Sequence, residues 1–135
     1  MTNPQFTSYQ RHGDVAEIQL VNPPVNGLGH EVRQSLHAHL GEAMADAQVR
    51  AIVLSGAGKM FCGGADIRQF NTPKATALPM LRDINRLIES SMKPVIAAIH
   101  GNALGGGLEL AMSCHYRIAT AGTRLALPEV KLGIL

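Results

Sequence analysis

The stretch GNALGGGLEL (101–110) places three consecutive glycines, Gly105, Gly106 and Gly107, directly before an apolar run typical of a helix, with the carboxylate of Glu109 inside that run. Backbone amides in the first turn of a helix lack intrahelical acceptors and lie at the positive end of the helix dipole. Glycine allows a ligand to approach those amides closely. The stretch therefore predicts a site for a negatively charged oxygen. The alternative is that the glycines only permit a tight turn and close packing of strand on helix.

The segments around this stretch alternate between predicted strands and predicted helices, which indicates an α/β domain. The run 51–56 is continuously apolar and ends in glycine, as is typical of a parallel strand covered on both faces. Strands are predicted at 14–21, 51–56, 94–101 and 116–120, and helices from His30 to Met44, from Leu78 to Ile88 and through Leu110–Met112.

The helix predicted to begin near His30 has an amphipathic pattern. Apolar residues recur at spacings of three and four, and the opposite face is expected to expose Arg33, Gln34 and Glu42.

Composition limits the possible partners. The chain has 135 residues, of which 46% are hydrophobic, enough for one globular domain with a sizeable core. A net charge of +2 and 4% aromatic residues do not favour nucleic acid. No stretch approaches the ~20 apolar residues of a spanning helix, so no membrane partner is expected and the predicted location is the cytoplasm.

Neither cysteines nor histidines suggest a metal site. Cys62 and Cys114 lack CxxC spacing and are expected to be buried thiols in a reducing compartment. His37 and His39 are two residues apart, about 200° around a helix, so they cannot hold one ion together and are expected at the surface. No metal is predicted.

Both glycine-rich segments follow a predicted buried strand, where open α/β sheets collect ligands. Neither GGADIR (63–68) nor GNALGGG (101–107) contains GxxxxGK[ST] or GxGxxG. Nucleotide-binding loops of those two kinds are therefore not expected.

Three segments carry a resemblance to a known family. FCGGADI (61–67), KPVIAAIHGNALGGGLELAMSCHYRIA (93–119) and LALPEVKLGIL (125–135) resemble the crotonase superfamily of enoyl-CoA hydratases and isomerases. With PPVNGLG near the start, the chain is most similar to the N-terminal hydratase part of bifunctional enoyl-CoA hydratase/3-hydroxyacyl-CoA dehydrogenases. The resemblance implies a crotonase-like α/β fold of ββα repeats, with a mostly parallel sheet flanked by helices. It assigns residues 1–13 to an N-terminal extension and 14–135 to the N-terminal core of a crotonase-type domain.

The resemblance also implies which groups take part in catalysis. Backbone N–H groups of Ala65 and Gly106 would form an oxyanion hole for the thioester oxygen, Glu109 would activate water, and Glu129 would exchange a proton with the substrate α-carbon. Either acid has another explanation. Glu109 in a first turn stabilises a helix dipole, and Pro128-Glu129 can simply open a helix.

Further residues are implied at the coenzyme A moiety. These are Ala65, Asp66, Ile67, Arg68 and Gly106, with Arg68 able to face a phosphate. The alternative for Asp66 is a helix N-cap.

The implied function is hydration of 2-trans-enoyl-CoA to 3-hydroxyacyl-CoA in fatty-acid β-oxidation. A shift of a 3-enoyl double bond to the 2 position is compatible with it as a second activity. Acyl-CoA would be the substrate, no cofactor is expected, and NAD would bind only to a dehydrogenase part outside this chain. A homo-oligomer is expected. Family members continue well past LPEVKLGIL, so C-terminal truncation is also expected, and the alternative function is a non-catalytic fragment that binds acyl-CoA or self-associates.

Overall fold

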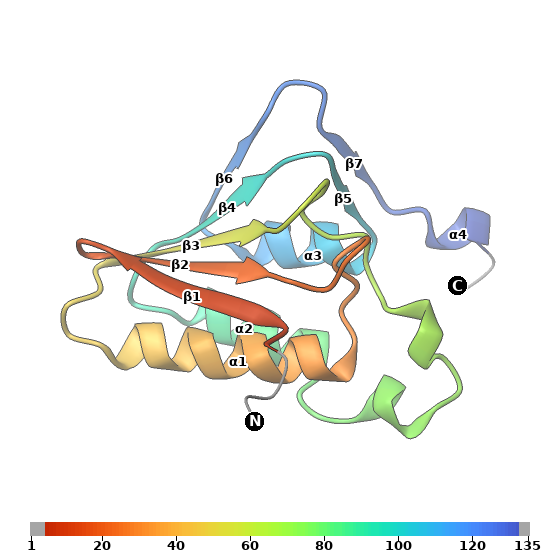
Figure 1. The fold of residues 1–135 in the computed structure, drawn as a ribbon, viewed down its shortest axis with the longest axis horizontal. Helices are drawn as coiled ribbons and strands as arrows, with labels where there is room; N and C mark the ends of the chain where they lie inside the picture. Colours follow the sequence, from red (N-terminus) through yellow and green to blue (C-terminus); the bar gives the residue numbers. More distant parts are fainter. Residues whose placement is uncertain (1–4, 133–135) are drawn as a thin grey trace.

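The computed structural model describes residues 5–132, and within that range five strands form the main sheet (Figure 1). The first two strands are antiparallel, and every other neighbouring pair is parallel. The sheet order is β1 (Thr7–His12), β2 (Val15–Leu20), β3 (Ala51–Gly56), β4 (Val95–Ile99) and β6 (Tyr116–Ala119). A small second sheet pairs β5 (Asn102–Leu104) in parallel with β7 (Arg124–Ala126).

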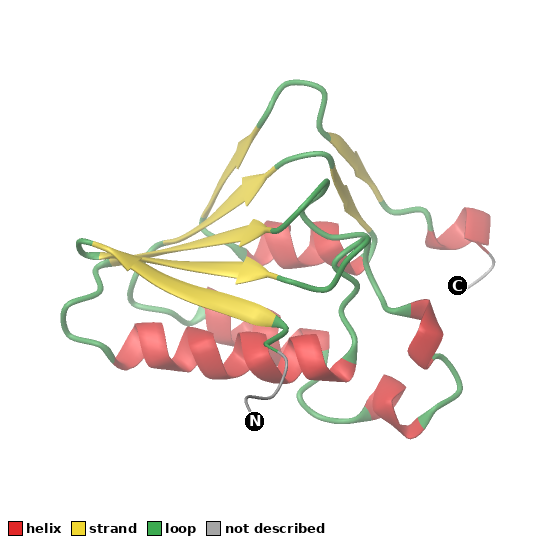
Figure 2. Cartoon of the chain, in the orientation of Figure 1, coloured by secondary structure: helices red, strands yellow, loops and turns green. Residues whose placement is uncertain are grey.

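Three helices lie on one side of the main sheet (Figure 2). They are α1 (His30–Ala45), α2 (Leu81–Glu89) and α3 (Gly106–Ser113), and a short α4 (Glu129–Leu132) follows β7. Two 3-10 turns, η1 (Ile67–Gln69) and η2 (Pro73–Thr76), connect β3 to α2. The predicted α/β architecture with a mostly parallel sheet is confirmed.

The prediction that strand 51–56 is covered on both faces is wrong for the described part of the chain. Ile52 and Leu54 are buried, whereas Val53 and Ser55 between them are half-buried. The reason is that α1, α2 and α3 all lie on the same face of the sheet (Figure 1). The core therefore fills one layer between sheet and helices.

Helix α1 buries the predicted apolar stripe, but it also buries one residue of the face that is expected to be exposed. Gln34 and Glu42 are exposed as expected, whereas Arg33 is only 6% exposed. The expectation for Arg33 is wrong because its guanidinium donates to backbone carbonyls, including those of Leu28 and Pro79, which satisfy it inside the protein.

Two further segments differ from the sequence prediction. The helix predicted from Leu78 begins at Leu81, and Leu78 is 71% exposed. Strand β1 lies within residues 1–13, where no strand was predicted, and Thr7 on it is buried and hydrogen-bonded to Ser35 of α1. A strand with so many polar residues is not visible as a hydrophobic alternation.

No helix among residues 5–132 combines the length and the apolar content needed to cross a bilayer.

The buried face of α1 offers a direct test of this core. Leu36 is 0% exposed, so Leu36→Ala should lower the free energy of unfolding by about 2–5 kcal/mol, because it leaves a cavity in a packed layer. The adjacent exposed His37→Ala should change it by less than about 0.5 kcal/mol. Denaturant titration of both variants measures the difference, and equal losses would contradict this placement of the core.

Candidate active site at two glycine-rich turns

The loop after β3 runs between two other segments of the chain. Cys62 donates its N–H to Asn102 O at 3.1 Å and accepts from Leu104 N at 3.0 Å. On the other side, Gly63 N donates to Val25 O at 2.7 Å, and Leu28 N donates to Gly64 O at 2.8 Å. The loop that leads to Ala65 is therefore fixed against both the segment before α1 and strand β5.

Glycines allow the two turns to approach this closely. A Cβ placed on Gly64 would lie 2.9 Å from Leu104 O and 3.5 Å from Gly106 N, and one on Gly107 would collide with the backbone oxygen of Cys62. Gly64 also has a φ of 103°, which side chains disfavour. Close packing, one of the two explanations considered for the triple glycine, is thus part of its role.

The two amides predicted to form an oxyanion hole lie close together. A Cβ placed on Gly106 would be 3.9 Å from Ala65 N. Gly106 is the first residue of α3, where a backbone N–H has no intrahelical acceptor. Within residues 5–132, no hydrogen bond uses the N–H of Ala65 or of Gly106. Both donors are available to a ligand.

A mainly apolar cavity of about 150 Å³ adjoins these amides. Most of its surface comes from aliphatic side chains of three different segments of the chain. Its lining residues are Leu28, Arg33, Ala65, Ala75, Met80, Leu81 and Gly106.

One predicted acid lies on α3 and the other on α4. Glu109 is exposed in the first turn, its N–H bonds to Gly105 O, and helical side chains lean toward the preceding turn. Glu129, the first residue of α4, approaches from the other side of the chain. A Cβ placed on Gly105 would lie 2.5 Å from Glu129 Oε1. The structure therefore brings the Glu129 carboxylate to the start of α3, the helix that carries Gly106 and Glu109.

The residues directly after Ala65 form the capped turn η1. Asp66 accepts from Arg68 N at 3.1 Å and so caps η1, which confirms the N-cap considered for it. Its carboxylate also pairs with the exposed Arg68 guanidinium at 2.8 Å, and the hydrogen bonds from Arg68 hold the pKa of Asp66 below its usual value. Ile67 is 70% exposed and contributes no side chain to the core.

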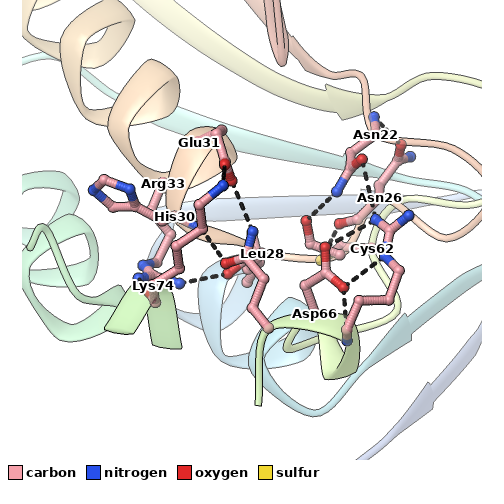
Figure 3. A network of polar contacts seen from close by, with 12 residues as sticks. Asn22, Asn26, Leu28, His30, Glu31, Arg33, Cys62, Asp66 and Lys74 are labelled. Atoms are coloured by element: carbon pink, nitrogen blue, oxygen red, sulfur yellow. Dashed lines mark hydrogen bonds and ion pairs between the residues drawn. The ribbon is translucent and has the colours of Figure 1, made fainter. Parts of the chain in front are cut away.

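Sequence analysis missed Asn26, a buried residue that braces this site (Figure 3). Its Nδ2 donates to Ala57 O at 2.9 Å and Met60 O at 2.8 Å, and its Oδ1 accepts from Asn22 N at 3.0 Å. Its φ is 53°, a conformation that asparagine tolerates better than most residues. The signal in the sequence is this asparagine in the turn PPVNG (23–27), which reads only as a break between elements.

Both cysteines are buried free thiols, as predicted. Burial raises the pKa of Cys62 and that of Cys114 to about 12, so both stay protonated at neutral pH. His37 is exposed, and His39 is half-buried and contacts Thr7. Across the described residues, no three His, Cys, Asp or Glu side chains are placed to share a metal ion.

Asn26 supplies a test of how the site is held. Asn26→Ala should lower the free energy of unfolding by about 1–3 kcal/mol, because it removes the side-chain donor from the part-buried carbonyls of Ala57 and Met60 and the buried carbonyl of Phe61. Asn26→Asp keeps the shape of the side chain but replaces the Nδ2 donor with an oxygen. It should lower the free energy of unfolding by at least as much as Asn26→Ala. Thermal and denaturant unfolding measure both, and a stable Asn26→Asp protein would show that these donor bonds matter little.

Comparisons with known proteins show the family. The profile of the family described as Enoyl-CoA hydratase/isomerase matches residues 10–135. A peroxisomal bifunctional enzyme of Danio rerio is 52% identical over 121 residues, covering 90% of this chain and 17% of that protein. A probable enoyl-CoA hydratase of Bacillus subtilis (strain 168) is 45% identical over 126 residues, covering 90% of this chain and 49% of that protein.

Comparison with solved structures leads to the same family. The crystal structure of an enoyl-CoA hydratase/ carnithine racemase from Magnetospirillum magneticum superposes with a TM-score of 0.90 at 32% identity, covering 98% of this chain and 53% of the other. The chain thus spans about half or less of the length of these proteins. The resemblance drawn from the glycine-rich segments is confirmed, and the chain belongs to the enoyl-CoA hydratase/isomerase family of the crotonase superfamily.

Proposed function

We propose that this chain hydrates 2-trans-enoyl-CoA to 3-hydroxyacyl-CoA, a reaction of fatty-acid β-oxidation. One observation carries the proposal. The N–H groups of Ala65 and Gly106, both without an acceptor among residues 5–132, lie together beside an apolar cavity, and the Glu129 carboxylate lies against the neighbouring Gly105. Family membership supports the same reaction class.

The two amides act on the thioester oxygen. Addition of water at C3 of a 2-enoyl thioester moves negative charge onto that oxygen, and two aimed N–H donors stabilise the enolate-like transition state. In other enzymes each such donor contributes about 3–4 kcal/mol. The positive end of the α3 dipole at Gly106 adds to the effect.

The two carboxylates divide the proton transfers between the reacting carbons. Glu109 accepts a proton from the water that attacks C3, and Glu129 delivers a proton to C2. The same Glu129 can move a proton between C2 and C4 without water, so isomerisation of 3-enoyl thioesters is the second activity in this proposal. No cofactor or metal is needed for either reaction.

The coenzyme A moiety is assigned to the rim formed by Ala65, Asp66, Ile67 and Arg68. Arg68 is 63% exposed and already paired with Asp66, so a phosphate would share its guanidinium with that carboxylate. NAD is not part of the proposal. A homo-oligomer and a location in the cytoplasm stay predictions.

The alternative function is a non-catalytic fragment that binds acyl-CoA or self-associates. One observation favours it. Strands β6 and β7 are exposed along their whole length, with Ile118 67% and Leu125 52% exposed, and such apolar surface is typical of an interface.

Substitution of the two acids distinguishes these functions. Glu109→Gln should lower hydration about 10²–10⁴-fold and spare residual isomerisation, whereas Glu129→Gln should suppress both, because only Glu129 serves C2. Hydration of a short and a long 2-enoyl-CoA and isomerisation of a 3-enoyl-CoA measure these rates. Affinity for the saturated acyl-CoA should change little in either variant.

Glu89→Gln is the matched control, since Glu89 is exposed at the end of α2. Equal loss of both activities in Glu109→Gln, or surviving isomerisation in Glu129→Gln, would overturn the division of roles. Acyl-CoA binding without any turnover by the unmodified chain would favour the non-catalytic alternative.

A further inference from the structure

The segment 69–80 closes one side of the cavity beside Ala65 and Gly106. Ala75 and Met80 of this segment line the cavity, and Leu81 follows at the start of α2. The position of the segment therefore sets how far an acyl chain can extend from the two amides.

Apolar burial does not hold this segment in place. None of residues 67–80 is buried, and Phe70 and Leu78 are 39% and 71% exposed. Its regular structure is limited to the two 3-10 turns η1 and η2. Something other than the core must fix its distance from the amides.

The guanidinium of Arg33 supplies the main attachment. Its Nε donates to Pro79 O at 2.7 Å, and its Nη2 donates to Lys74 O and Ala77 O, both at 2.9 Å. Its Nη1 donates to Leu28 O at 2.8 Å. One side chain of α1 thus bonds to Leu28, two residues before the helix, and to three carbonyls spread over the segment.

The first turn of α1 adds weaker attachments at the surface (Figure 3). His30 N donates to Gln69 Oε1 at 2.8 Å, and Glu31 pairs with Lys74 and accepts from Gln69 Nε2 at 2.7 Å. The hydrogen bond from Lys74, with those from its own backbone and from Gln69, lowers the pKa of Glu31 to about 2. These partners are half-buried or exposed, unlike Arg33.

Only an arginine at position 33 can donate to all four of these carbonyls. Four acceptors in different directions need the fixed, planar set of five N–H donors of a guanidinium, whereas lysine has a compact ammonium with three. Arg33 also lines the cavity, so the residue that holds the segment borders the space that the segment closes.

We propose that Arg33 is a positioning residue that sets the depth of the acyl cavity and so makes the site selective for short acyl chains. This inference rests on the proposed acyl-CoA function. The held segment leaves a cavity of about 150 Å³, well below the roughly 300–1,000 Å³ of pockets for drug-sized ligands. Release of the segment should admit longer chains without moving the amides, which are fixed by separate hydrogen bonds.

The test compares Arg33→Met with Arg33→Lys and with the control Arg50→Met, whose arginine is exposed. Met has an unbranched chain and no donor. Trypsin cleavage after Lys74 in the free protein should accelerate at least about tenfold in Arg33→Met, because several hydrogen bonds to the segment are lost. It should accelerate less in Arg33→Lys and remain unchanged in Arg50→Met.

Binding of butyryl-CoA, decanoyl-CoA and unacylated coenzyme A is then measured by calorimetry. The unmodified chain should favour butyryl-CoA over decanoyl-CoA. In Arg33→Met the ratio of the butyryl-CoA affinity to the decanoyl-CoA affinity should fall at least about tenfold, and in Arg33→Lys it should fall less. The affinity for unacylated coenzyme A should stay the same in both variants. If Arg33→Met does not fold, Arg33→Lys decides by the same two measurements.

Unchanged cleavage after Lys74, or an unchanged ratio in a variant that folds, would overturn the role of Arg33 while leaving the proposed function intact. If the unmodified chain binds neither acyl-CoA, the proposed function fails and this inference fails with it.

Discussion

The close approach of two glycine-rich turns is the constraint on which the site depends. The carbonyls of Cys62 and Leu104 lie where Cβ atoms on Gly107 and Gly64 would be, so neither turn could keep its place with a side chain there. This contact brings the N–H groups of Ala65 and Gly106 together and leaves both without an acceptor among the described residues. Packing and chemistry therefore impose the same requirement on these glycines.

The fold supplies the rigidity that such a contact needs. Parallel strands β3 and β4 deliver both turns to the same edge of the sheet, as is usual for ligand sites in α/β proteins (Figure 1). Asn26 then fixes the loop after β3, and Arg33 holds the segment that closes the cavity. Both are polar side chains buried against backbone carbonyls, and each donates to carbonyls of loops and turns outside the main sheet and the α-helices.

How much the sequence predicts depends on whether a residue acts through a local pattern. Apolar periodicity predicts α1 and short apolar runs predict β3 and β4, because such patterns are local. The glycine runs alone predict a site for an anionic oxygen, and only the family resemblance assigns it to Ala65 and Gly106. The same periodicity predicts Arg33 on the exposed face, yet Arg33 is buried. Three of its four acceptors, at Lys74, Ala77 and Pro79, lie more than 40 residues away in the sequence, where no local pattern reveals them. The sequence does not predict strand β1, because its residues are mostly polar and show no apolar alternation. The strand is visible only through its pairing with β2.

In the proposed reaction, two backbone amides polarise the thioester carbonyl. Infrared difference spectroscopy of butyryl-CoA isotopically labelled at that carbonyl measures the polarisation directly in the bound state. Two hydrogen bonds from fixed backbone donors should shift the carbonyl stretch to lower frequency than in solution. Gly106→Val, which would place a branched side chain at the cavity, should abolish the shift. A bound carbonyl with the frequency it has in water would contradict the account.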